Sequence, residues 1–136
     1  MSPDEPQRSL SERRLTRARQ HLKSAADLLA HDDFGDSVSR SYYAIFQAAR
    51  ALLASAQLDS RKHSGVVALF NRHFVKTGRV EKQLGVILKD AQRARELADY
   101  SDIAEVTRDE AEAQLRDAEV FVRRVTEQLA VPYGSE

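Results

Sequence analysis

Proline is confined to the two ends of this 136-residue chain, at positions 3, 6 and 132. Because proline removes a backbone donor and breaks helix interiors, residues 7–131 are free to form helices throughout. Within that stretch, apolar residues recur at steps of three and four, which places their side chains on one face of a helix. No segment alternates apolar and polar residues between turn signals, as a half-buried strand would. We therefore predict an all-α fold.

Five helical segments follow from this spacing and from the breaks between them. The first spans about 11–31 and the second ends near residue 57, after the interruption HDDFGDS. The third opens near 60 or 63, the fourth covers about 80–98, and the fifth covers 107–129. We expect Asp36 or Ser37 to cap the second helix, and Gly78 to close the third in a left-handed conformation. Thr107 has capping-box spacing to Glu110 and should open the fifth.

Short connections make neighbouring helices antiparallel, and seams spaced at three and four favour shallow crossing angles. The expected architecture is an up-and-down helical bundle of four to five helices. A chain of this length fits one domain with a continuous core. We predict a disordered N-terminal segment over 1–8, the bundle over 9–130 and a C-terminal tail over 131–136.

The composition excludes several classes of function. Lys and Arg number 21, as do Asp and Glu, so the zero net charge gives no global attraction to nucleic acid or membranes. The absence of cysteine removes disulfides, thiolate nucleophiles and Cys-based zinc sites. The N-terminus lacks the apolar core of a signal peptide, and no run of about eighteen apolar residues occurs. Since no phosphate loop, metal motif or nucleophile elbow appears either, we predict a cytoplasmic protein without metal, cofactor or membrane association.

The second helix contains two lines of side chains. One is an apolar stripe that belongs to the core: Tyr42, Ile45, Ala49 and Leu52. The other forms an aromatic and basic edge beside that stripe: Arg40, Tyr43, Gln47 and Arg50. This pattern indicates a helix that is mostly buried and has one polar rim.

Three segments in this order resemble the HEPN domain, the higher eukaryote and prokaryote nucleotide-binding family, in its small stand-alone prokaryotic type. They are RSYYAIFQAARALL, then KHSG followed by FNRHF, then RARELADYSD. The resemblance extends from about Ser9 to Ala130. It implies a small helical bundle, commonly a homodimer, found in two-gene modules beside a minimal nucleotidyltransferase.

Some members of this family are toxin ribonucleases, whose catalytic motif is an Arg, four to six residues, and a His late in the bundle. In this sequence the last histidine is His73, so the fourth helix has no such pair. Arg14 and His21 have the spacing but lie in the first helix. The motif is therefore not at the expected place, and we predict no catalytic residue.

The resemblance and the polar rim together indicate a candidate ligand site where the second helix meets the end of the fourth. There the arginines would contact an anion and the other side chains would orient it: Tyr43, Arg50, Arg95, Asp99 and Tyr100. The alternative is structural, since Arg95 and Asp99 have the spacing of an ordinary ion pair on one helix.

Two further basic features can likewise be interpreted either as ligand contacts or as structural residues. His63 opens the third helix after Arg61 and Lys62, where it can contact a phosphate or simply cap and pack. Arg13, Arg14 and Arg17 can form a cationic strip on the first helix, although most such strips are only solvated.

The function that we predict is a homodimeric HEPN-like binding module. Its partner would be a minimal nucleotidyltransferase in a toxin–antitoxin-like or nucleotide-linked system, with a nucleotide or RNA as ligand. Two alternatives stay open. One is a metal-independent ribonuclease toxin that uses an arginine with His63 or His73, and the other is a purely structural dimerisation domain.

Overall fold

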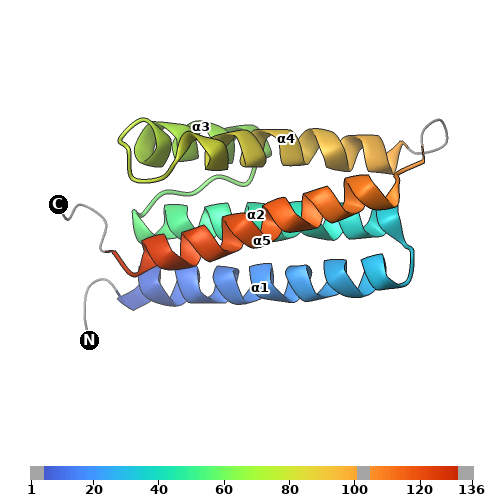
Figure 1. The fold of residues 1–136 in the computed structure, drawn as a ribbon. Coiled ribbons are helices and arrows are strands. Elements are labelled where there is room, and N and C mark those ends of the chain that lie inside the picture. The colour runs from blue at the N-terminus through green and yellow to red at the C-terminus, as the bar shows by residue number, and fades with distance from the viewer. Residues whose placement is uncertain (1–4, 101–104, 132–136) are drawn as a thin grey trace.

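A computed structural model describes residues 5–100 and 105–131, and most of them are helical (Figure 1). Within those residues there is no strand, which confirms the predicted all-α fold. None of the described helices combines the length and the hydropathy needed to span a membrane. The elements in chain order are α1 Glu5–Ala30, α2 Phe34–Ser55, α3 His63–Phe70, the π-helical turn η1 Asn71–Val75, α4 Lys82–Asp99 and α5 Arg108–Leu129.

The long helices run alternately up and down, as predicted from their short connections (Figure 1). Helix α2 is central and contacts α1, α3, α4 and α5. Helix α1 lies on one side of α2, while α3 and α4 lie on the opposite side (Figure 1). This position explains why α2 needs apolar residues well beyond a single stripe.

The core is built around α2. Its predicted apolar stripe is confirmed, because four residues are at most 5% exposed: Tyr42, Ile45, Ala49 and Leu52. Small buried side chains between them let the neighbouring helices approach closely: Ala44, Ala48 and Ala51. Phe70 of α3 packs on Phe121 of α5 with ring centroids 5.5 Å apart. Burial of each such large side chain contributes about 1.5–3 kcal/mol.

Two predicted helix ends are confirmed. Gly78 adopts φ +77°, the left-handed conformation that glycine reaches without a Cβ clash, and the chain turns there after η1. Thr107 precedes α5, and its hydroxyl oxygen accepts a hydrogen bond of 3.1 Å from the backbone N–H of Glu110. The cap satisfies one of the free donors at the helix start.

Two other expectations about helix ends are wrong. Helix α2 begins at Phe34, so Ser37 lies inside it, and its hydroxyl donates to the carbonyl of Ala25 in α1 at 2.8 Å. Ser37 thus joins two helices and caps neither. Helix α1 begins at Glu5, well before residue 11, so residues 5–8 of the expected N-terminal segment are helical. Residues 1–4 and 132–136 lie outside the described residues.

Gly65 positions the start of α3. A Cβ on Gly65 would lie 2.1 Å from the hydroxyl oxygen of Ser60, so only glycine leaves room for this serine. Ser60 in turn stabilises the preceding bend, since its hydroxyl accepts from the backbone N–H of Lys62 at 3.3 Å. The close approach brings His63, the first residue of α3, against α2.

Candidate functional site

Four rings from α2 and α3 form a continuous cluster, which we call the aromatic strip: Tyr42, Tyr43, Phe46 and His63. Tyr42 contacts each of the other three, with ring centroids 5.1 Å from Tyr43, 5.8 Å from Phe46 and 5.6 Å from His63. Phe46 also stacks on His63 at 5.9 Å. Because Tyr42 is 5% exposed, the strip is anchored in the core and reaches the surface through its other members.

Arg95 of α4 closes one end of the aromatic strip. Its guanidinium carbon lies 5.1 Å from the ring centroid of Tyr42 and 5.1 Å from that of Tyr43. Its Nε lies 3.5 Å from Asp99, which confirms that this pair forms the ion pair expected from spacing. Cation–π contacts of this kind stabilise by about 0.5–1 kcal/mol each at exposed sites. The Arg95 side chain is one-third exposed, so part of it remains accessible to solvent.

His63 is enclosed by this cluster. The Tyr42 hydroxyl lies 3.2 Å from its Nδ1, and its Nε2 is buried without a hydrogen-bond partner in the described part of the chain. Burial lowers the pKa of His63, and the Glu96 charge and the Leu88 carbonyl only partly oppose this. The Leu88 carbonyl lies near the ring without hydrogen-bond geometry. His63 is therefore a neutral packing residue at pH 7, and its ring nitrogens are not available to a reacting group.

Arg50 lies at the other end of the aromatic strip. Its guanidinium carbon is 5.8 Å from the ring centroid of Phe46, and it forms a 3.0 Å ion pair with Asp59 in the loop after α2. Arg14 of α1 pairs with the same carboxylate at 3.2 Å. Burial favours the protonated form of Asp59, but hydrogen bonds from Arg50 and Arg14 outweigh it and lower the pKa of Asp59. Arg50 and Arg95 thus belong to two separate clusters.

Tyr43 and Tyr100 have different surroundings. The ring of Tyr43 lies between His21 of α1, at 5.6 Å, and the guanidinium of Arg95. Tyr100 follows α4 directly and is 77% exposed. In the described part of the chain no hydrogen bond or ring contact joins Tyr100 to the other predicted site residues. The structure therefore brings Tyr43, His63, Arg95 and Asp99 together and leaves Arg50 and Tyr100 at the margins.

The sequence did not indicate three members of these clusters: His21, Phe46 and Asp59. The His21 ring contacts that of Tyr43 in a tilted arrangement, and its Nδ1 lies 3.4 Å from a guanidinium nitrogen of Arg40. Burial lowers the pKa of His21, and the charges of Arg40 and Arg17 lower it further. A helical wheel of α1 places His21 two turns after Arg14, which was the one available signal. Residues 5–100 and 105–131 contain no group of three or more His, Cys, Asp or Glu arranged to hold a metal ion.

Comparison with known proteins agrees with this architecture. Residues 11–129 match the HEPN domain. A "UPF0332 protein" of Thermotoga maritima is 41% identical over 106 residues, which is 78% of this chain and 80% of the relative. "Putative toxin MJ0605" of Methanocaldococcus jannaschii is 38% identical over 112 residues, 82% of this chain and 83% of the relative. "Putative toxin MJ0142" of the same organism is 30% identical over 118 residues, 87% and 80%. This chain therefore belongs to the HEPN domain family.

Proposed function

We propose that this protein is the binding component of a toxin–antitoxin-like or nucleotide-linked system in the cytoplasm. It acts through its helical bundle, residues 9–130, as a homodimer, and its partner is a minimal nucleotidyltransferase. The ligand is anionic, either a nucleotide or RNA, and Arg95 contacts it while Tyr43 and Asp99 fix the direction of the guanidinium. The names of two relatives, which contain the words "Putative toxin", support the toxin-related part of this proposal.

The observation that carries the proposal is the state of His63 beside Arg95. Catalysis of RNA cleavage without a metal needs a side chain that takes or gives a proton. His63 is the histidine of this cluster, but its Nε2 is buried and its Nδ1 lies 3.2 Å from the Tyr42 hydroxyl. Arg95 has a permanent positive charge, and its side chain is one-third exposed. The cluster is thus suited to binding an anion and not to proton transfer.

The exposed face of α4 supports the dimer. Val86 and Leu97 on this helix, and Tyr100 directly after it, are 50%, 62% and 77% exposed. Their spacing of eleven and three residues places them on one side of a helix, with the exposed Arg93 between them. Large apolar side chains aligned on an outer face are typical of a surface that another chain covers. A second copy would bring two Arg95 clusters close to each other.

Partner binding can be measured by titrating the proposed partner, a purified minimal nucleotidyltransferase, with wild-type protein and with Arg95→Gln. We expect Arg95→Gln to weaken partner or nucleotide binding by about tenfold, the value of one charged hydrogen bond. Arg116→Gln, which removes an exposed arginine from α5, is the matched control and should bind like wild type. Equal affinities for all three proteins, with the fold intact by circular dichroism, would reject the proposed site.

The dimer is tested by sedimentation equilibrium of wild-type protein and of Leu97→Glu. A carboxylate on the outer face of α4 costs little in a monomer but is unfavourable inside an apolar interface. We expect the wild-type mass to correspond to two chains and the mass of Leu97→Glu to correspond to one. A monomeric wild-type protein would remove homodimerisation from the proposal and also the structural dimerisation alternative.

The ribonuclease alternative depends on one observation, that Arg95 and His63 both contact Tyr42 in one cluster. Incubation of purified protein with RNA in EDTA separates it from the binding module. We expect the RNA to stay intact. Cleavage that disappears in His63→Ala and persists in His31→Ala would replace the binding module with a metal-independent ribonuclease.

A further inference from the structure

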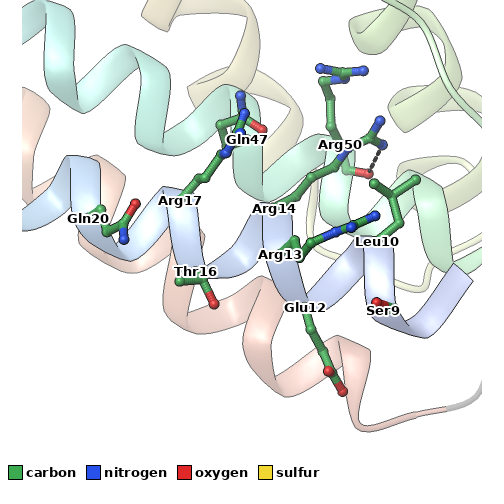
Figure 2. A pocket seen from close by; sticks show the side chains of 10 residues that line it. All are labelled: Ser9, Leu10, Glu12, Arg13, Arg14, Thr16, Arg17, Gln20, Gln47 and Arg50. Carbon is green, nitrogen blue, oxygen red and sulfur yellow. Dashed lines mark hydrogen bonds between the residues drawn. The ribbon is translucent and has the colours of Figure 1, made fainter. Parts of the chain in front are cut away.

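A groove lies between the first half of α1 and the second half of α2, away from the Arg95 cluster. We call it the α1–α2 groove. It has a volume of about 700 Å³, and its walls contain four arginines and a single acidic residue: Arg13, Arg14, Arg17, Arg50 and Glu12 (Figure 2). The side chain of Glu12 extends away from α2 and from these arginines (Figure 2). The size is in the range of small-molecule binding sites.

The four arginines fall into two pairs that differ in their partners. Arg14 and Arg50 share Asp59, at 3.2 and 3.0 Å, and Arg14 also donates to the Arg50 carbonyl at 3.1 Å. Arg14 is 9% exposed, so this inner pair is rigid. Arg13 and Arg17 are exposed, and in residues 5–100 and 105–131 no carboxylate pairs with either of them. Arg14 and Arg50, the inner pair, form the back wall of the groove. Arg13 and Arg17, the outer pair, are not neutralised by a carboxylate of the described residues.

The structure gives a second sign of this excess charge. His21 lies one turn beyond Arg17 on α1, and after burial the charges of Arg40 and Arg17 lower its pKa. A positive field at this face thus acts on a neighbouring group. Arg13 and Arg17 are both exposed, so burial in the core does not explain why these like charges lie together. An anion bound between them would remove their mutual repulsion.

The geometry limits the chemistry of that anion. Arg13 and Arg17 are one helical turn apart, about 5–6 Å between their Cβ atoms. Planar guanidinium forks bind phosphate oxygens through paired hydrogen bonds, and two forks at this separation suit two neighbouring phosphates. Gln47 lines the groove from α2 and adds a neutral amide donor. No aromatic side chain lines the groove, so it has no ring face on which a base could stack.

We infer that the α1–α2 groove binds a ligand with two adjacent phosphate groups, held by Arg13 and Arg17 against the back wall of Arg14 and Arg50. Either a small polyphosphate or the backbone of a single-stranded RNA presents such phosphates. Recognition depends on the phosphates and not on the bases, since no free ring is available for stacking. The inference goes beyond the proposed function, because it needs neither the dimer, nor the partner protein, nor Arg95.

The test uses the isolated full-length protein at low salt with two probes, inorganic pyrophosphate by calorimetry and a labelled short oligouridylate by fluorescence anisotropy. The variant is Arg13→Gln/Arg17→Gln, and the charge-matched control is Arg116→Gln/Arg123→Gln, which removes two exposed arginines from α5. We expect the groove variant to bind at least one probe roughly tenfold or more weakly, and the control to bind like wild type.

The two probes distinguish the sources of the phosphates. Loss of pyrophosphate binding alone assigns a small polyphosphate, and loss of oligouridylate binding alone assigns an RNA backbone. A second variant, Gln47→Glu, places a carboxylate inside the groove and should reduce the same binding. The inference is overturned if wild type binds neither probe, if the groove variant and the α5 control lose affinity equally, or if Gln47→Glu retains full affinity.

Discussion

The Arg95 cluster and the α1–α2 groove both place arginines beside α2, but they differ in what already satisfies those arginines. Arg95 lies over two tyrosine rings and pairs with Asp99. In the groove, Arg13 and Arg17 reach solvent without a carboxylate partner in the described part of the chain. An engaged arginine contributes to the stability of the fold, whereas an exposed and unpaired one can be replaced at little cost in stability. Substitutions in the two regions should therefore separate stability from binding.

The largest expected difference concerns the centre of the aromatic strip. Tyr42→Ala removes a ring that is 5% exposed and contacts Tyr43, Phe46 and His63. We expect the free energy of unfolding to fall by about 3–5 kcal/mol, as for other buried aromatic residues. Arg17→Ala in the groove should change it by less than about 0.5 kcal/mol. Urea denaturation of both variants measures this, and similar losses would show that the two regions do not differ in structural role.

The next prediction separates the inner and outer arginines of the groove. Arg14→Met removes the donor to the Arg50 carbonyl and one of the two arginines on Asp59. Because Arg14 is 9% exposed and loses two polar contacts of its charged group, we expect a loss of about 1–3 kcal/mol. Arg13→Met changes the neighbouring exposed position and should be nearly neutral. The same urea titrations apply, and an equal effect of the two substitutions would contradict the assignment of Arg14 to a rigid back wall.

A smaller effect is expected for the hydroxyl groups of the adjacent tyrosines. Tyr42→Phe keeps the ring but removes the hydrogen bond to His63, so we expect a loss of about 1 kcal/mol. Tyr43→Phe is the matched control, because the described residues include no partner for its hydroxyl. Thermal denaturation of the two variants compares them directly. If Tyr43→Phe is the more destabilised protein, the hydrogen bond between Tyr42 and His63 is not the polar contact that stabilises the aromatic strip.

The sequence predicts the fold well because its information is local. The three-four spacing of Tyr42, Ile45, Ala49 and Leu52 identifies the buried face of α2, and Thr107 and Gly78 mark helix ends through their own chemistry. The pairing of distant groups is not encoded in this way. Ser37 looks like a cap in sequence but bonds to α1, because the helix starts three residues earlier than expected.

In the candidate site, too, the sequence predicts contacts within one helix but not contacts between distant segments. The spacing of Arg95 and Asp99 predicts their ion pair, since both lie on one helix. Arg50 and Arg95 were grouped because both adjoin the rim of α2. The structure separates them, because Arg50 and Arg14 both form ion pairs with Asp59, which lies in a loop. No periodic pattern predicts where a loop carboxylate will lie. The α1–α2 groove likewise depends on the approach of two helices, which a strip of arginines on α1 cannot specify alone.

The smallest predicted effect is a dependence of stability on pH that arises next to both regions. Burial lowers the pKa of His63, beside Tyr42 and Glu96, and the pKa of His21, where Arg40 and Arg17 add to the effect. As pH falls through the ordinary histidine value of 6.5, the unfolded chain therefore binds more protons than the folded one. The free energy of unfolding should decrease from pH 7.5 towards acid, and urea titrations across this range will measure the slope.

Two substitutions assign that slope to its sources. His63→Gln should flatten it by removing the contribution of the aromatic strip, and His21→Gln should flatten it by removing the contribution next to the groove. His31→Gln, at the exposed end of α1, controls for the substitution itself. Because Arg17 acts on His21 and not on His63, Arg17→Gln should reduce only the part of the slope that His21→Gln also removes. If Arg17→Gln left the contribution of His21 unchanged, the charge of Arg17 would not affect the pKa of His21. The groove would then not differ from the Arg95 cluster in carrying an excess positive charge.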